Sequence, residues 1–260
     1  MTWFNGIYKN IRKFLIEVGD ISFFAGRYFR ELVHPPFEWK ELLRQCYQLG
    51  NRSLVLVVVT GFIIGLVLTL QSRPTLIEFG AESWMPNMVG ISIVRELGPV
   101  ITALVCAGRI ASGIGAELGS MRVTEQIDAM EVSGTNPFKY LVVTRVLAAT
   151  LMLPLLVILA DVVALYGSAL VEFFKGDVSF RLYFNQVFDA LGYGDLVPAT
   201  IKSFFFGFAI GIVGCYKGYY SKKGTAGVGL AANSAVVFTS MLLFILDFIA
   251  VFVADIFYEL

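Results

Sequence analysis

The sequence predicts an all-α integral membrane protein. An amino-terminal interfacial amphipathic helix is followed by five transmembrane helices, with a short cytoplasmic helix between the second and third. Of the 260 residues, 57% are hydrophobic and 15% are charged, whereas soluble globular domains carry about 25% charged residues. The mean hydropathy is +0.74. This composition excludes an ordinary cytosolic enzyme and a disordered regulator.

The segment before His34 has the pattern of an amphipathic helix. Its apolar residues recur three or four apart, so they share one helical face: Phe4, Ile7, Ile11, Phe14, Val18, Ile21, Ala25, Tyr28 and Leu32. Basic residues on the opposite face are typical of a helix that lies in the membrane interface. A helix packed on a soluble domain is the alternative interpretation. We expect residues 1–52 to form the interfacial segment and residues 53–260 to form the five-span domain.

The clearest span covers residues 53–72, which carry no charge. At about 1.5 Å per residue, this length matches a hydrocarbon core of about 30 Å. Further spans are predicted at about residues 87–119, 141–174, 201–220 and 225–257. Glycines four residues apart predict close contacts between these helices. Such pairs are Gly61 with Gly65, Gly115 with Gly119, Gly207 with Gly211, and Gly214 with Gly218.

The Lys and Arg counts predict the orientation, because cytoplasmic loops carry an excess of these residues. Fifteen fall on the side of the amino terminus and four on the other side. We therefore expect a cytoplasmic amino terminus and a carboxyl terminus outside. Lys+Arg and Asp+Glu are both 20, so no nucleic-acid surface is expected. Three widely separated cysteines and one histidine predict neither a disulfide framework nor a metal site.

Charged residues inside the predicted spans are candidates for function. Only 12 uncharged residues separate Glu96 from Arg109, about 18 Å of helix, so one charged group must lie within the membrane or face a cavity. Arg95 and Glu96 are expected to face a bundle interior or a substrate path; the alternative is a purely structural pair. Asp161 and Asp247 fit either a proton relay or hydrogen-bonded structural carboxylates, and we favour the structural interpretation.

The polar link at residues 117–137 predicts a short helix between two spans. Met121, Thr124, Ile127, Met130 and Glu131 follow helical spacing, and Gly134 with Pro137 ends the pattern. With Glu125 and Asp128 exposed, this helix suggests a docking surface for a soluble partner. A surface-lying helix without a partner is the alternative. The chain has no GxxxxGK[ST] phosphate loop, so it cannot bind nucleotide by that mechanism.

Several motifs resemble the MlaE/YrbE permease family, the membrane subunits of phospholipid ABC transporters that work with Mce proteins. They are QCYQLGNRSL at residues 45–54, TGFIIGLVLTLQ at 60–71, RELGP at 95–99, AGR at 107–109, AELGSMRVTEQIDAME at 116–131, NP at 136–137, LPLL at 153–156, GYY at 218–220 with GTAGVG at 224–229, and LDF at 246–248. The run from RELGP through TEQ is long and specific. The resemblance covers most of the chain beyond about residue 40.

The resemblance implies a homodimer in the bacterial inner membrane, coupled to a cytoplasmic ABC ATPase dimer. It also implies an Mce-domain lipid-binding ring on the outer side and a role in maintaining outer-membrane lipid asymmetry. The subunit itself is then non-catalytic and needs no cofactor. The implied coupling residues are Glu117, Met121, Arg122, Thr124, Glu125, Gln126, Asp128, Met130 and Glu131.

The phospholipid is expected in a cavity at the dimer interface, lined by spans one, two and five. Leu68, Gln71, Leu76 and Phe79 are placed at the outer end of span one, with Arg95 and Glu96 near the head group. An ion- or proton-coupled secondary transporter that uses Arg95, Glu96, Asp161 and Asp247 is the alternative function. A membrane scaffold without transport is a third.

Overall fold

The computed structural model describes residues 2–176, 178–222 and 224–258; the side chains of residues 2–11, 13, 14, 257 and 258 lie outside that description. The helices in chain order are α1 (Thr2–Val33), α2 (Trp39–Glu78), η1 (Glu82–Trp84), α3 (Met85–Ser92), η2 (Ile93–Leu97), α4 (Gly98–Cys106), η3 (Ala107–Ala111), α5 (Ser112–Val123), α6 (Gln126–Val132), η4 (Phe138–Val143), α7 (Thr144–Lys175), α8 (Phe180–Ala190), α9 (Tyr193–Tyr219) and α10 (Thr225–Tyr258). None of the residues described forms a strand, so the all-α prediction is confirmed.

Five helical stretches are long and apolar enough to cross a membrane, as predicted. They are Trp39–Glu78, Glu82–Val123, Phe138–Lys175, Tyr193–Tyr219 and Thr225–Ile256 within the described part of the chain. The first begins at Trp39 rather than at Ser53, because residues 39–52 continue the helix without a break. Its 40 residues extend over about 60 Å, so α2 exceeds a hydrocarbon core of about 30 Å.

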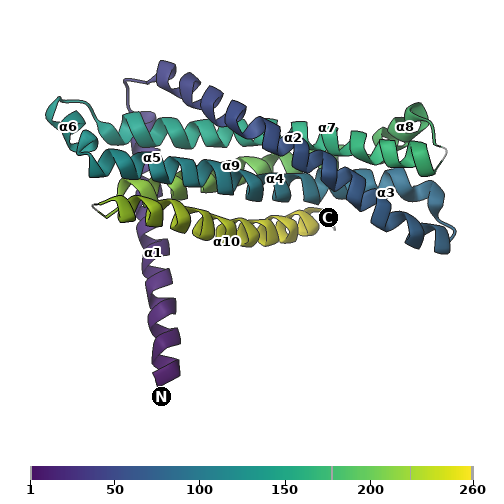
Figure 1. Ribbon diagram of the computed structural model, residues 1–260, viewed down its shortest axis with the longest axis horizontal. Coiled ribbons are helices and arrows are strands. Elements are labelled where there is room, and N and C mark those ends of the chain that lie inside the picture. Colours follow the sequence, from purple (N-terminus) through teal and green to yellow (C-terminus); the bar gives the residue numbers. More distant parts are fainter. Residues whose placement is uncertain (1, 177, 223, 259–260) are drawn as a thin grey trace.

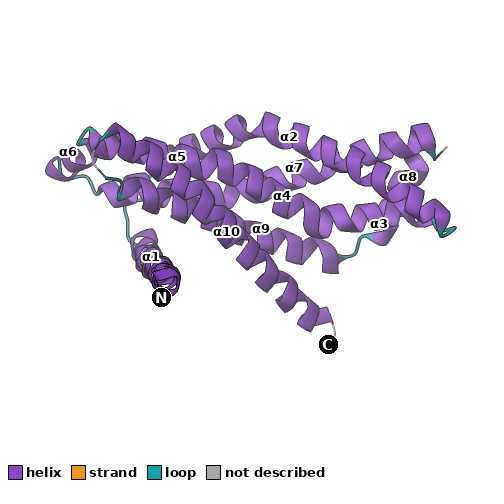
Figure 2. Cartoon of the chain, turned by 60° about the horizontal axis from the view of Figure 1, so that its bottom comes forward, coloured by secondary structure: helices purple, strands orange, loops and turns teal. Residues whose placement is uncertain are grey.

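The spanning helices run side by side, whereas α1 lies across them (Figure 1). One end of the bundle carries α6, and we call it the α6 end. The opposite end carries α3 and α8, and we call it the α8 end. Near the α6 end, α1 crosses the bundle. Figure 2 shows α10 turning away from the other helices toward its carboxyl terminus.

The inner face of α1 packs on the bundle. Ile21, Phe24 and Tyr28 are buried, and the Phe24 ring lies 5.0 Å from Phe138 and 5.6 Å from Tyr216. Burial raises the pKa of Tyr28 above its usual range. Of the predicted apolar positions in the described half, Ile21, Ala25, Tyr28 and Leu32 therefore contact the bundle, whereas Val18 is exposed. The predicted positions Phe4, Ile7, Ile11 and Phe14 have side chains outside the description.

Glycines bring neighbouring helices into backbone contact, as their spacing predicts. A Cβ at Gly61 of α2 would lie 2.8 Å from the backbone oxygen of Ala160 in α7, and one at Gly65 would overlap the backbone oxygen of Ala164. A Cβ at Gly207 of α9 would lie 2.6 Å from Ala149 O of α7. No side chain separates α2, α7 and α9 at these points, so α7 is held between the other two helices.

We predict that Gly65→Ala destabilises the protein, because the added methyl group has no room against Ala164. Overpacking of this kind costs about 1–3 kcal/mol, and each kcal/mol lowers the melting temperature by about 2–4 °C in a domain of this size. Gly19→Ala in α1 is the matched control, since nothing lies within 4 Å of its added Cβ. Equal melting temperatures for the two purified variants would contradict the packing argument.

Candidate functional site

A pocket opens between α9 and α10 where the two helices diverge. Its volume is about 670 Å³. Its wall is almost wholly apolar and consists of Tyr193, Gly194, Val197, Pro198, Ile201, Lys202, Phe205, Phe206, Leu246, Ile249, Ala250, Val253 and Ala254. Lys202 is the charged member of this set. The carboxyl-terminal part of α10 leaves the bundle here (Figure 2), so one side of the pocket depends on a single helix.

Lys202 joins three helical segments through its ammonium group. The side chain is 6% exposed, donates a hydrogen bond to the carboxylate of Glu96 in η2, and lies 2.9 Å from Asp247 Oδ1 in α10. The contact with Asp247 is ionic, and its angles fall outside those of a hydrogen bond. A lone charge at the centre of a membrane helix costs about 2.5–3.5 kcal/mol on insertion scales. Two carboxylates around one ammonium reduce that cost and hold α9, η2 and α10 together.

Pro99 explains part of this geometry. Proline has no N–H, so the carbonyl four residues earlier loses its helical donor. That carbonyl belongs to Arg95, and Lys202 Nζ donates to it at 3.3 Å. The local chain also forms the π-helix η2, a departure from α geometry that occurs frequently at functional sites. Lys202 thus contacts both the carboxylate of Glu96 and the backbone carbonyl of Arg95.

Lys202 and Asp247 lie at similar depths in the two helices that line the pocket. Lys202 is nine residues from the start of α9 and Asp247 is eleven residues from the end of α10; these separations are about 14 Å and 16 Å of helix. Arg95 and Glu96 line a smaller hollow that shares Pro198, Lys202, Ala250 and Ala254 with the large pocket. A charged wall next to a large apolar volume suits an amphiphile, with its polar group at the ions and its apolar part in the pocket.

The predicted substrate residues fall into two groups. Arg95 and Glu96 lie beside the pocket. The side chains of Leu68 and Leu76 are half-buried against the cluster that contains Met85, Val89 and Ile93, while Gln71 and Phe79 are exposed. None of the four residues from α2 lines the α9–α10 pocket. Within one chain, the structure therefore does not bring the α2 residues and the Arg95–Glu96 pair into one pocket.

Two intramembrane carboxylates differ from the sequence-based interpretation. Asp247 has a basic partner, Lys202, which is one of the four basic residues that the charge count assigned to the outer side. Asp161 Oδ1 has no hydrogen-bond partner among the residues described, so at this oxygen the expected hydrogen bond is not found. Asp161 packs on α4 so closely that a Cβ on Gly98 would overlap its carboxylate. The residues around Lys202 in the sequence are mostly apolar, and this feature could have indicated that the lysine is buried.

The coupling segment also differs in its helical bounds. The predicted helix at residues 121–134 is divided, because Glu125 adopts a left-handed conformation with φ 58°. Met121 and Arg122 belong to the last turn of α5, and Thr124 Oγ1 donates to Ser120 O at 2.9 Å. The separate helix α6 begins at Gln126 and ends at Val132.

The α6 helix is fixed to the bundle on one side and exposed on the other. Ile127 is fully buried, and Met121 and Met130 pack against the same core. Arg122 donates to Asp128 at 2.5 Å. The predicted coupling residues that remain exposed are Thr124, Glu125, Gln126 and Glu131, and Glu117 is exposed near the end of α5.

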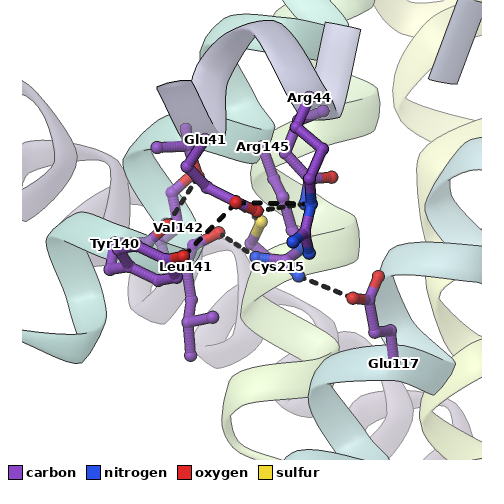
Figure 3. Close-up of polar contacts among 10 residues, drawn as sticks. Glu41, Arg44, Glu117, Tyr140, Leu141, Val142, Arg145 and Cys215 are labelled. Atoms are coloured by element: carbon purple, nitrogen blue, oxygen red, sulfur yellow. Dashed lines mark hydrogen bonds and ion pairs between the residues drawn. The ribbon is translucent and has the colours of Figure 1, made fainter. Parts of the chain in front are cut away.

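Two buried arginines form contacts that sequence reasoning missed. At the α6 end, Arg145 of α7 donates to Glu117 Oε1 at 2.7 Å and to Leu141 O at 3.0 Å (Figure 3). At the α8 end, Arg73 of α2 donates to both carboxylate oxygens of Glu172 in α7, at 3.0 and 2.9 Å, and to Glu82 of η1. Arg145 and Glu117 are 28 residues apart and Arg73 and Glu172 are 99 apart, so no local pattern marks these two pairings.

The sequence matches known proteins along most of its length. The family model described as Permease MlaE matches residues 42–253. A probable ABC transporter permease protein of Rickettsia felis is 40% identical over 245 residues, which are 94% of this chain and 95% of that protein. A probable ABC transporter permease protein of Synechocystis sp. is 34% identical, over 87% of this chain and 86% of that protein. Protein TRIGALACTOSYLDIACYLGLYCEROL 1, chloroplastic, of Arabidopsis thaliana is 33% identical, over 88% of this chain and 66% of that protein.

The five spanning helices agree with these relationships, because the Rickettsia felis and Synechocystis proteins are named as permeases. The family match covers the coupling segment and all five spans, and the identity to the Rickettsia felis protein extends over nearly the whole chain. The chain therefore belongs to the MlaE permease family and is a membrane permease subunit of an ABC transporter.

Proposed function

We propose that this permease moves phospholipid between the bacterial inner membrane and an Mce-type carrier. The observation that carries the proposal is the α9–α10 pocket, which is apolar over about 670 Å³ and has Lys202 in its wall. This arrangement suits a molecule with acyl chains and a charged head group. The name of the Arabidopsis thaliana relative contains trigalactosyldiacylglycerol, which is consistent with a lipid substrate.

The transport step needs no covalent chemistry in this subunit. Acyl chains occupy the apolar pocket, and the phosphate of the head group approaches the basic groups of Arg95 and Lys202. Lys202 is already paired with Glu96 and Asp247, so a bound phosphate competes with these carboxylates. Rearrangement of the ion pairs then allows α10 to move relative to α9. The family membership assigns the energy source to an ATPase partner, which makes a secondary transporter driven by ions the weaker interpretation.

We place the ATPase dimer on α6. This helix lies at one tip of the bundle (Figure 1), and its inner side is anchored by Ile127, which is fully buried. Its exposed side carries Glu125, Gln126 and Glu131. A short helix that is anchored on one face and acidic on the other is suited to receive a basic groove on a soluble partner.

A homodimer would complete the lipid site. The outward face of α10 exposes large apolar side chains, including Phe244, Phe248 and Phe252, and a second copy would cover part of them. In such a dimer, residues of α2 from one subunit approach the pocket of the other. Leu68, Gln71, Leu76 and Phe79 then contact lipid, as the family resemblance implies. The Mce ring is placed at the α8 end, opposite α6.

We predict that Ala250→Trp lowers the amount of phospholipid that copurifies with the complex. Ala250 lines the pocket, so the indole fills space intended for acyl chains. A loss of about 1.4 kcal/mol in binding free energy corresponds to a tenfold weaker affinity. Lipid extraction with mass spectrometry measures the change. Leu155→Trp, on the exposed side of α7, is the control, and equal lipid content in both variants would argue against this pocket.

We predict that Glu125→Lys combined with Glu131→Lys prevents the ATPase from copurifying, because the exposed surface of α6 changes from acidic to basic. Asp128 is left unchanged, since its ion pair with Arg122 holds α6 in place. Affinity purification through a tag on the permease measures ATPase recovery. The double substitution Glu78→Lys with Asp189→Lys, two exposed carboxylates at the α8 end, should retain the ATPase. Full recovery with the α6 variant would exclude this docking surface.

We predict that the α6 end is cytoplasmic. A cysteine at Arg12, which is exposed in α1, should react with a membrane-impermeant maleimide only after the cells are opened. Cys46, Cys106 and Cys215 are replaced beforehand. A cysteine at Glu78, exposed at the α8 end, should react in intact spheroplasts. Labelling in the reverse order would show the opposite orientation.

A further inference from the structure

The ion pair between Glu117 and Arg145 lies between the proposed ATPase-docking helix and the rest of the bundle. Glu117 is in α5, two turns before α6 begins, and its side chain is 47% exposed. Arg145 is in the first turn of α7, and only 2% of its side chain is exposed. The guanidinium donates to Glu117 Oε1 at 2.7 Å (Figure 3). The pair therefore connects the end of the second span to the beginning of the third.

Movement of α6 must be shared by the end of α5. Arg122 of α5 donates to Asp128 of α6 at 2.5 Å, and Ile127 is fully buried in the core. The Glu125 turn between the two helices is short and left-handed. These contacts leave little freedom for α6 to rotate on its own, so a force applied to α6 reaches Glu117.

From Arg145 the contacts continue to the beginning of α2. A second nitrogen of Arg145 donates to Leu141 O at 3.0 Å. The adjacent residue, Tyr140, donates its hydroxyl to Glu41 Oε2 at 3.3 Å. Glu41 is buried in the first turn of α2 and accepts a hydrogen bond from Gln45 at 2.7 Å. Figure 3 shows these polar groups on neighbouring helices, with Glu41 and Glu117 on opposite sides of Arg145.

Stability alone does not account for an arginine at this position. A buried ion pair is often no more stabilising than apolar residues of the same volume, because both charges lose their hydration. In addition, Nε of Arg145 has no hydrogen-bond partner among the residues described. A group that is expensive to bury and joins α5 to α7 is better explained by a positioning role.

We propose that the Glu117–Arg145 ion pair transmits the movement of α6 to α7 and α2, and thereby couples ATP hydrolysis to lipid movement. Arg145 and Glu117 are positioning residues, since neither lines the lipid pocket. Glu117 was expected to contact the ATPase as part of the coupling surface; here its carboxylate instead acts inside the permease. The proposal rests on the proposed docking of the ATPase at α6.

The test is Glu117→Gln in the complete complex, reconstituted in phospholipid vesicles with its ATPase. The half-exposed position tolerates an isosteric amide, so the variant should fold and retain the ATPase. We expect ATP hydrolysis to continue while the lipid moved per ATP falls by about fivefold or more, the lower bound of common coupling energies. Glu78→Gln, an exposed carboxylate at the far end of α2, should leave this ratio unchanged. A normal ratio in Glu117→Gln would overturn the proposal.

A double-mutant cycle distinguishes transmission from independent damage. If the two residues act as one unit, Glu117→Gln combined with Arg145→Gln should lower the ratio no further than the more severe single variant. Additive losses would overturn the proposal. Should Arg145→Gln fail to assemble, the ratio measured for Glu117→Gln decides alone.

ATPase recovery separates this proposal from the docking proposal. Loss of the ATPase from Glu117→Gln would show that Glu117 contacts the partner directly, and would overturn the transmission role. Retention of the ATPase by Glu125→Lys with Glu131→Lys would instead exclude docking on α6, whatever the ratio in Glu117→Gln.

Discussion

A charge inside an apolar bundle must be neutralised by groups on other helices, and this requirement determines how the helices of the permease are held. Lys202 meets the requirement with Glu96 and Asp247. Arg73 meets it with Glu172 and Glu82. Because the desolvation of an isolated ion is so costly, each basic side chain fixes the register of the segments that surround it. The pocket, the α8 end and the α6 end each depend on one such group.

The fold could be predicted from the sequence because hydrophobic spans and amphipathic periodicity are local signals. The lengths of the helices were harder to predict from the sequence. Residues 39–52 of α2 are polar enough to resemble a separate segment, although the helix runs through them. The break between α5 and α6 could not be predicted either. Glu125 is not a glycine, and nothing in the neighbouring sequence indicates a residue in the left-handed conformation. Local patterns therefore identified the elements and missed some of their limits.

The candidate site could be predicted only in part. Arg95 and Glu96 attracted attention because charges in a span are unusual. Their partner Lys202 is 106 residues beyond Glu96, and only tertiary structure brings it there. The hydrogen bond from Lys202 to the carbonyl of Arg95 likewise depends on tertiary structure. The pocket itself results from the divergence of α10, which no sequence pattern records. The predicted residues at the end of α2 lie outside this pocket in the single chain.

The backbone contacts between α2 and α7 have a consequence for how the permease changes shape. Two helices separated by side chains can slide past each other, because the side chains can change rotamer. The backbones of α2 and α7 touch at Gly61 and Gly65, so these two helices cannot adjust in that way. Together with α9, which meets α7 at Gly207, they form one rigid unit. The carboxyl-terminal part of α10, by contrast, leaves the bundle (Figure 2). A change of shape is therefore expected at α10 rather than between α2, α7 and α9, and it would alter the width of the α9–α10 pocket.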